Sequence, residues 1–248
     1  MDGVIKHKQA VGVAADIAVF ALPKRGHAAD EYEDAHATSS AGAWPLHAAV
    51  ADGATEAAYS RYWATVLADG WVDEAPHDVA AWRWLLPAWR KKWRDHVARQ
   101  VQQRAWYAAA KAEQGAFAAF LGLSVFADGT WQAVSQGDCV VLHVRSESVV
   151  TAWPISDPEA FSYRPTLVAS HSRSEAGESP HSTTGAWADG DTLLLASDAL
   201  GAWLLRTGPA AAVRWDAEAA ASAIQSARTN GGLANDDVTL VRLTLHAA

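Results

Sequence analysis

The sequence has very little cysteine and no long apolar run. Cys139 is the only cysteine among 248 residues, which excludes an internal disulfide framework and a cysteine-based zinc finger. No uninterrupted apolar stretch approaches the ~20 residues that cross a bilayer. The first residues, Met1, Asp2 and Gly3, lack the charged start and apolar core of a signal peptide. We therefore expect a soluble, cytoplasmic, globular protein without a membrane partner.

Positive charge is also scarce. The chain has 20 Lys and Arg residues against 28 Asp and Glu, a formal net charge of −8. A field of that sign does not attract a phosphate backbone, so we expect no nucleic-acid partner. The balance is uneven, because seven basic residues and one acid lie between Arg83 and Arg104. This basic segment is either a solvated face or a docking surface for an acidic partner.

Half of the residues are apolar, enough to bury a proper core. No solenoid repeat or heptad pattern interrupts the chain, and we expect residues 1–248 to form one domain. Strand and helix patterns are mixed but do not alternate strictly, which fits a doubly wound parallel sheet poorly. The pattern favours an α+β protein in which largely antiparallel sheet is covered by helices.

Apolar spacing and turn residues locate the expected elements. Strand patterns occupy residues 11–20, 35–39, 46–51, 117–126, 131–136, 139–145, 192–196 and 238–245. Helical patterns occupy residues 56–68, with a stop at Gly70, then 77–113, 200–205 and 217–227.

Three features of this pattern leave alternatives open. Pro87 either kinks the second helix or begins a new one. The stripe that contains Trp82, Trp89 and Trp93 is either core packing or a partner groove. Residues 170–185, rich in Ser, His and Gly, are expected to form a mobile loop that either covers a site or is simply flexible.

Carboxylates recur where strands begin or end. They are Glu33-Asp34, Asp52, Asp138, Asp198 and Asp236-Asp237. If such side chains converge at one edge of a rigid sheet, their mutual repulsion requires a cation. Oxygen-only ligands indicate Mg²⁺ or Mn²⁺ rather than zinc. Two such ions ~3.5–4 Å apart would activate a bridging water and hold a phosphoryl group for in-line attack.

In their order and spacing, these motifs resemble those of the metal-dependent protein phosphatases of the type 2C family. The resemblance extends from about Val11 to Leu245, and residues 51–56 with Trp63 resemble a bacterial stand-alone subgroup. The matching segments are Glu33-Asp34-Ala35, Val50-Ala51-Asp52-Gly53, Gly115-Ala116-Phe117, Gln136-Gly137-Asp138, Leu194-Leu195-Ala196-Ser197-Asp198 and Asp236-Asp237-Val238-Thr239. The resemblance implies a four-layer α-β-β-α sandwich of two mainly antiparallel sheets flanked by helices, and a bacterial signalling enzyme.

The resemblance also implies the roles of individual residues. Asp52 would bridge two Mg²⁺ or Mn²⁺ ions, and Asp198 and Asp236 would complete the first, so that these three are the predicted catalytic residues. The remaining predicted ligands are Glu33 and the carbonyl of Gly53 for the second ion, Asp34 close behind them, and Asp138 for a possible third ion.

One departure from the family pattern concerns the substrate phosphate. The family often has an arginine four residues before the Glu of its first motif, and here that position is Ala29. The candidates to replace it are Lys24, Arg25 and His27.

Two functions follow as hypotheses. The first is a phosphatase that hydrolyses phosphoserine or phosphothreonine in a phosphoprotein by a metal-bridged water. The second is a catalytically weak or inactive regulatory module of the same fold that binds metal or phosphate. A degenerate module should have lost one of Asp52, Asp198 and Asp236. All three are present, which favours the enzyme.

Overall fold

The computed structural model describes residues 12–54, 59–101, 114–161, 165–171 and 179–247. The strands are β1 Val13–Leu22, β2 Ala35–Thr38, β3 Leu46–Gly53, β4 Phe117–Val125, β5 Thr130–Gln136, β6 Val140–Arg145, β7 Ser148–Trp153, β8 Val168–Ala169, β9 His181–Ala186, β10 Thr192–Ala196 and β11 Val238–Ala247. The α-helices are α1 Ser60–Glu74, α2 Val79–Val101, α4 Asp198–Thr207 and α5 Ala217–Thr229, and short 3-10 turns lie at Ala29–Glu31 (η1), Pro158–Ala160 (η2) and Ala212–Arg214 (η4).

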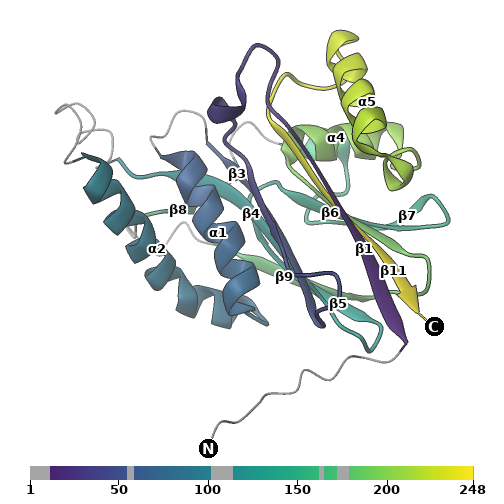
Figure 1. The fold of residues 1–248 in the computed structure, drawn as a ribbon, viewed down its shortest axis with the longest axis horizontal. Coiled ribbons are helices and arrows are strands. Elements are labelled where there is room, and N and C mark those ends of the chain that lie inside the picture. The colour runs from purple at the N-terminus through teal and green to yellow at the C-terminus, as the bar shows by residue number, and fades with distance from the viewer. Residues whose placement is uncertain (1–11, 55–58, 102–113, 162–164, 172–178, 248) are drawn as a thin grey trace, which may run out of the picture.

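The strands form two sheets (Figure 1). Sheet A has the order β1-β11-β10-β6-β7, and sheet B has the order β2-β3-β4-β5-β9, with β8 added beside β4. Every pairing between described strands is antiparallel. The two sheets therefore agree with the predicted antiparallel α+β class.

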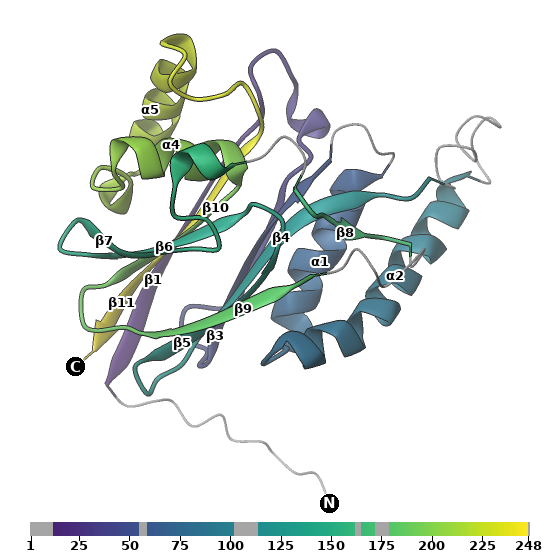
Figure 2. The same ribbon diagram turned by 180° about the vertical axis from the view of Figure 1, so that it is seen from behind.

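Helices cover the outer face of each sheet (Figures 1 and 2). On sheet B, α1 and α2 bury Trp63 and Trp82 against Phe120 of β4. On sheet A, α4 and α5 bury Leu200 and Ile224 in a separate apolar cluster. A further cluster fills the space between the sheets. The order helix, sheet, sheet, helix confirms the predicted four-layer sandwich.

Strand β3 shows why the sheet sequences read as continuous apolar runs. Ala49 and Ala51 face α1 and α2, whereas Ala48 and Val50 face the opposite sheet. Successive side chains of a strand point to opposite faces, and here both faces are covered. The apolar stretch therefore contains no polar alternation, and its end at Asp52 marks the place where the strand leaves the core.

The first helix does not end at Gly70 as predicted. Helix α1 continues to Glu74 and ends at Ala75, which has a left-handed backbone with φ 46°. Gly70 lies in the contact with α2, where an added Cβ atom would come within 2.5 Å of the Trp89 ring. This glycine is therefore a close-packing position and not a helix stop. The predicted start near Glu56 lies outside the described residues.

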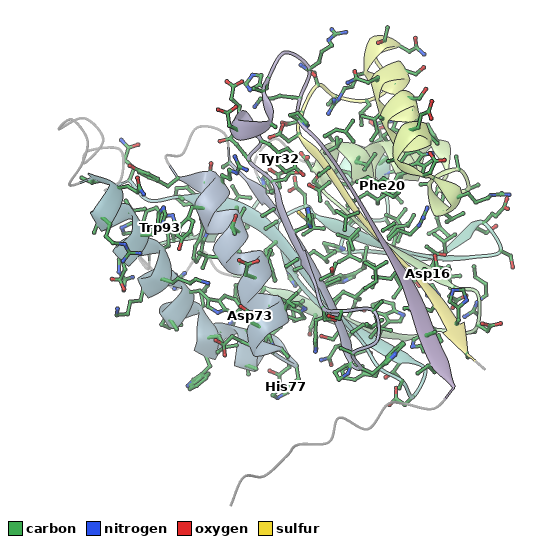
Figure 3. The ribbon with its side chains drawn as sticks, viewed as in Figure 1. Asp16, Phe20, Tyr32, Asp73, His77 and Trp93 are labelled. Atoms are coloured by element: carbon green, nitrogen blue, oxygen red, sulfur yellow. The ribbon has the colours of Figure 1, made fainter. Side chains whose placement is uncertain are left out.

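Helix α2 runs through Pro87 without a break, so no new helix begins there. Its predicted extension from residue 102 to Glu113 lies outside the described residues. Trp82, Trp89 and Trp93 are buried against α1 and sheet B, and Trp93 is labelled in Figure 3. The stripe is therefore core packing, and its alternative as a partner groove is wrong. None of the described helices combines the length and apolarity needed to cross a membrane.

The loop predicted over residues 170–185 is shorter than expected. His181–Ala186 forms β9, which pairs with β5 along the edge of sheet B. Because β9 is an edge strand with a largely exposed side, its Ser and Thr residues resemble a loop in composition. Residues 172–178 lie outside the described residues. The edge strand β7 was also missed, although its sequence Ser-Val-Val-Thr-Ala-Trp is rich in residues that favour strands.

Candidate metal centre

A cavity of about 620 Å³ opens at the edge where strands of both sheets end. Its wall contains five of the residues predicted as metal ligands: Asp52, Gly53, Asp138, Asp198 and Asp236. They come from separate parts of the chain, because β3 ends in Asp52-Gly53, Asp138 joins β5 to β6, Asp198 follows β10 and Asp236 precedes β11. The antiparallel order of the two sheets brings these strand ends together.

Asp52 and Asp198 lie at the centre of this site. Asp198 is the first residue of α4, and its carboxylate interacts electrostatically with that of Asp52. Burial raises the pKa of Asp52 well above its usual range, and repulsion from Asp34, Asp198 and other nearby carboxylates raises it further. Burial likewise raises the pKa of Asp198. Two carboxylates in such contact need either a shared proton or a cation between them.

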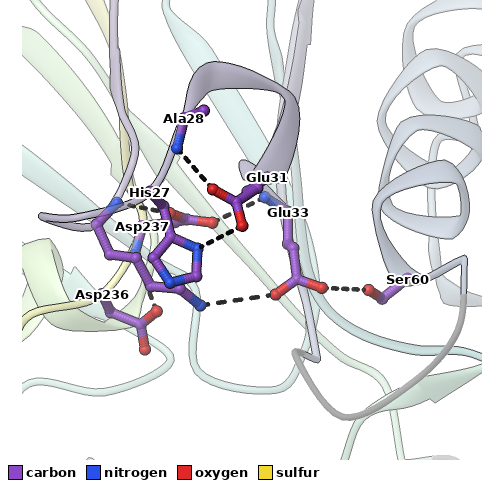
Figure 4. A network of polar contacts seen from close by, with 8 residues as sticks. His27, Ala28, Glu31, Glu33, Ser60, Asp236 and Asp237 are labelled. Carbon is purple, nitrogen blue, oxygen red and sulfur yellow. Dashed lines mark hydrogen bonds and ion pairs between the residues drawn. The ribbon is translucent and has the colours of Figure 1, made fainter.

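Asp236 and Asp237 are adjacent but have different surroundings (Figure 4). Asp236 belongs to the cavity wall. Asp237 is buried, and its two carboxylate oxygens accept hydrogen bonds from the backbone N–H groups of Lys24 and Glu33, each at 2.8 Å. Asp237 thereby holds both ends of the segment that carries Glu33 against the start of β11.

Asp34 lies behind the cavity wall and is 3% exposed. Its Oδ2 accepts a hydrogen bond of 2.6 Å from the hydroxyl of Thr239, which also contacts the hydroxyl of Tyr32. Its Oδ1 is buried and has no hydrogen-bond partner among the described residues. Burial raises the pKa of Asp34 to about 7. A buried carboxylate oxygen without a hydrogen-bond partner requires either a nearby cation or a hydrogen bond from a water molecule.

Glu33 lies beside the cavity and, among the described residues, is not part of its wall. Its carboxylate accepts a hydrogen bond of 2.9 Å from Ser60 Oγ, and Lys24 Nζ lies 3.8 Å from its Oε2. The backbone of Glu33 crosses Gly53 so closely that a Cβ atom at Gly53 would lie 2.7 Å from the Glu33 carbonyl oxygen. Only glycine fits after Asp52 at this crossing, and Ser60 is a contact that the sequence did not predict.

These residues fit a hard divalent cation, because every potential ligand atom is an oxygen. Within the described ranges, however, no three His, Cys, Asp or Glu side chains already surround one point. Asp198 instead accepts a hydrogen bond from the N–H of Ala199, and Asp236 accepts one of 2.9 Å from the N–H of Asp237. Each of these hydrogen bonds uses one carboxylate oxygen, so the second oxygen of Asp198 and of Asp236 remains available to an ion. The unpartnered oxygen of Asp34 and the repulsion around Asp52 both favour a cation here.

None of the three cations considered as substitutes at Ala29 belongs to the described cavity wall. The side chain of Lys24 is 12% exposed, and its Nζ lies 3.8 Å from Glu33 Oε2. His27 instead pairs with Glu31 at the surface. Ala29 itself is exposed in η1.

Arg206 is a cation of the cavity wall that the sequence did not predict. Its guanidinium lies 3.4 Å from the Glu159 carboxylate on the opposite side, in η2. Asp198, Ala202 and Arg206 are spaced by four along α4 and share one helix face. The predicted helix began at Leu200, two residues too late. Asp198 and Arg206 were therefore not predicted to share a helix face.

Comparisons with known proteins agree with the observed fold. A sequence profile described as protein phosphatase 2C matches residues 25–230, whereas no curated protein sequence matches the chain. The crystal structure of the serine/threonine phosphatase PstP/Ppp of Mycobacterium tuberculosis is similar over 94% of this chain and 99% of that chain, with 20% identity and a TM-score of 0.64.

Two further solved structures are similar to this chain. The catalytic domain of the phosphatase PstP in complex with 2 manganese ions has 20% identity and a TM-score of 0.60 over 94% of this chain and 99% of that chain. The serine/threonine phosphatase Stp1 of Staphylococcus aureus has 15% identity and a TM-score of 0.59 over 98% of this chain and 99% of that chain. At such identities the structures share the fold.

Proposed function

Because the chain belongs to the protein phosphatase 2C family, we propose that it hydrolyses phosphoserine and phosphothreonine in proteins at a site for two Mg²⁺ or Mn²⁺ ions. The observation that carries this proposal is the meeting of Asp52, Asp198 and Asp236, from three separate strand ends, in the wall of one cavity. The fold shared with a phosphatase that was solved with 2 manganese ions supports it.

Each carboxylate has a role in this proposal. Asp52 would hold both ions, Asp198 and Asp236 would hold the first, and Glu33 with the carbonyl of Gly53 would hold the second. Asp34 would support them from behind, and Asp138 would hold a third ion. The bound ions supply an activated water and neutralise charge on the transferred phosphoryl group. The protein residues would fix the positions of the ions.

The composition of the cavity wall supports direct attack by water. Its described residues include no Ser, Thr, Cys or His. Cys139, the one thiol of the chain, is completely buried, and burial raises its pKa well above the ordinary value. The hydroxyl of Ser197 is also buried and accepts the N–H of Thr239. Neither residue is placed to form a covalent phosphoenzyme.

Arg206 is our candidate for contact with the substrate phosphate. It is the cation of the described cavity wall, it lies about two turns along α4 from Asp198, and a planar guanidinium binds phosphate through paired hydrogen bonds. In this proposal Lys24 stabilises Glu33 instead. Arg206→Ala is therefore expected to raise KM for a phosphopeptide more strongly than Lys24→Ala does.

The decisive experiment measures Mn²⁺-dependent hydrolysis of para-nitrophenyl phosphate and of a phosphothreonine peptide. We compare the wild type with Asp52→Asn and Asp198→Asn, and use Asp16→Asn as the matched control because its side chain is 83% exposed at a distant strand. Loss of metal-supplied stabilisation of several kcal/mol should lower kcat/KM about 10³-fold in the two site variants. The control should retain wild-type activity.

Melting curves separate the remaining outcomes. A folded wild type without turnover, whose melting temperature Mn²⁺ nevertheless raises, would contradict the enzyme and favour the regulatory metal-binding module. A folded wild type with neither turnover nor a response to Mn²⁺ would contradict the metal site itself.

A further inference from the structure

Helix α2 has a charge opposite to that of the rest of the chain. It contains six basic residues and one acid, a net charge of +5. Because the whole chain carries −8, the remainder carries −13. The neighbouring helix α1 contains one basic residue and three acids. Helix α2 therefore has a net positive charge, whereas the rest of the protein is acidic overall.

The geometry of α2 places most of this charge on its outward face. The buried side chains Trp82, Leu86, Trp89, Trp93 and Val97 follow a spacing of three or four and fix the helix on sheet B. The basic side chains of the opposite face are exposed: Arg83, Lys91, Lys92, Arg94 and Arg99. Arg90 is the exception, since it is buried and donates to the carbonyl of Ala169.

Trp84 lies on this outward face, near the N-terminal end of α2. Its side chain is 80% exposed, whereas the other exposed large apolar side chains of the described residues reach at most 52%, at Val150. At 3.6 residues per turn, Trp84 and Lys91 lie about 20° apart around the helix axis. An exposed indole on the same helix face as several cations has the composition of an interface hot spot, because Trp and Arg dominate such sites.

The cations around Trp84 are largely unneutralised. Lys91 pairs with Asp95 at 2.6 Å. In the described part of the chain, Arg83, Arg94 and Arg99 form no ion pair. Apart from the exposed Lys91–Asp95 pair, a partner with negative charge would therefore not have to break internal salt bridges of the described residues in order to bind.

We propose that the α2 face, defined as Trp84 with Arg83, Lys91, Lys92, Arg94 and Arg99, is a docking surface for an acidic segment of a protein partner. In this arrangement an apolar side chain of the partner covers Trp84, and its acidic residues pair with Arg83 and with the cations that follow along α2. The α2 face shares no residue with the described cavity wall, so this docking does not depend on the phosphatase activity.

Charge and size select a short acidic segment over other anions. The 23 residues of α2 extend over about 35 Å at 1.5 Å per residue. A nucleic-acid duplex or an anionic bilayer extends beyond that length and would meet the net negative charge of the remaining chain. A short segment can place its acidic residues within the length of α2 and avoid this repulsion.

The test is a binding titration followed by fluorescence anisotropy. The probe is a fluorescein-labelled glutamate-rich peptide with one central phenylalanine, titrated with the full chain at low and at physiological salt. We expect saturable binding that weakens with salt. Trp84→Ala and the double variant Arg83→Glu with Arg94→Glu should each weaken it about tenfold or more.

Matched variants distinguish the α2 face from general surface effects. Val150→Ala removes another exposed apolar side chain, and Arg214→Glu reverses another exposed arginine. Both should bind the peptide as the wild type does. All variants should keep the wild-type melting temperature and turnover of para-nitrophenyl phosphate, because none of these residues belongs to the described cavity wall.

Four outcomes would overturn the proposal. They are absence of peptide binding by the wild type, undiminished binding by Trp84→Ala, an equal loss in Arg214→Glu, and tighter binding to phosphatidylserine vesicles or a DNA duplex than to the peptide. Sedimentation that shows a dimer lost in Trp84→Ala would assign the face to a second copy of this chain instead.

Discussion

Asp191 is a buried carboxylate whose environment favours its charge. It lies at the end of β10 opposite to the cavity, and its side chain is 0% exposed. Burial alone would raise its pKa, but hydrogen bonds from Arg145, the Ala188 N–H and His143 outweigh burial and lower the pKa to about 2. Asp52, at the other end of the sandwich, is surrounded by carboxylates instead, so its pKa is raised.

The variant Asp191→Asn should therefore destabilise the protein. Removing one partner from a fully buried ion pair costs roughly 3–5 kcal/mol, and we expect about 2 kcal/mol here because Arg145 is half exposed and remains solvated. The folded pKa is lower than the ordinary value of about 3.9. The wild type keeps this stability above pH ~4 and loses it as the pH falls toward 2. Urea unfolding of both proteins between pH 7 and pH 2.5 measures the effect, and equal stability at pH 7 would contradict it.

The variant Asp52→Asn should have the opposite effect on the metal-free protein. It removes one buried carboxylate from a group of like charges, so the free energy of unfolding should rise by about 1 kcal/mol. For a chain of this size that corresponds to about 2–4 °C in melting temperature. Melting curves in EDTA test the expected rise in melting temperature of the variant. Melting curves in Mn²⁺ test the metal effect, because the ion should stabilise the wild type and not the variant. Asp16→Asn serves as the control, and a lower melting temperature for Asp52→Asn in EDTA would contradict the repulsion.

At the scale of elements, the contact of α1 with α2 depends on Gly70. The Trp89 ring lies where a Cβ atom of residue 70 would be, so Gly70→Ala forces the two helices apart. Overpacking of this kind costs about 1–3 kcal/mol, which exceeds the ~1 kcal/mol that alanine gains in helix propensity. We expect lower stability in urea unfolding. As a control, Gly42→Ala should leave the free energy of unfolding nearly unchanged, because Gly42 is a turn position with open space around it. A higher stability of Gly70→Ala would contradict the prediction and would mean that α2 can shift without loss of stability.

The elements also show where prediction from sequence succeeds. Strands β3 and β10 are buried on both faces, so their apolar runs located them and, with them, Asp52 and Asp198. The edge strand β9 exposes polar side chains and resembles a loop, and β7 was missed although it contains Val149 and Val150. Arg206 and Ser60 became visible only after the helix starts and the packing of α1 were known. The roles of such residues depend on tertiary contacts that no local pattern contains.

At the scale of the whole molecule, the carboxylates of the cavity make stability depend on pH. Burial raises the pKa of Asp34 and of Asp138 to about 7, whereas in the unfolded chain both are near 3.9. Between pH ~4 and ~7 the folded protein therefore binds more protons than the unfolded chain, and metal-free stability falls as the pH rises. Asp191 does not oppose this trend, because its contribution is lost only at lower pH.

A divalent ion should reverse this dependence. It takes the place of the protons that the carboxylates otherwise hold, so its binding strengthens as the pH rises, and the stabilisation follows the affinity. We expect the shift in melting temperature between EDTA and Mn²⁺ to be larger at pH 8 than at pH 5, measured at matched ionic strength. The double variant Asp34→Asn with Asp138→Asn should show a flatter metal-free profile, because its two raised groups no longer titrate. Equal Mn²⁺ shifts at both pH values would mean that the ion binds elsewhere than among these carboxylates.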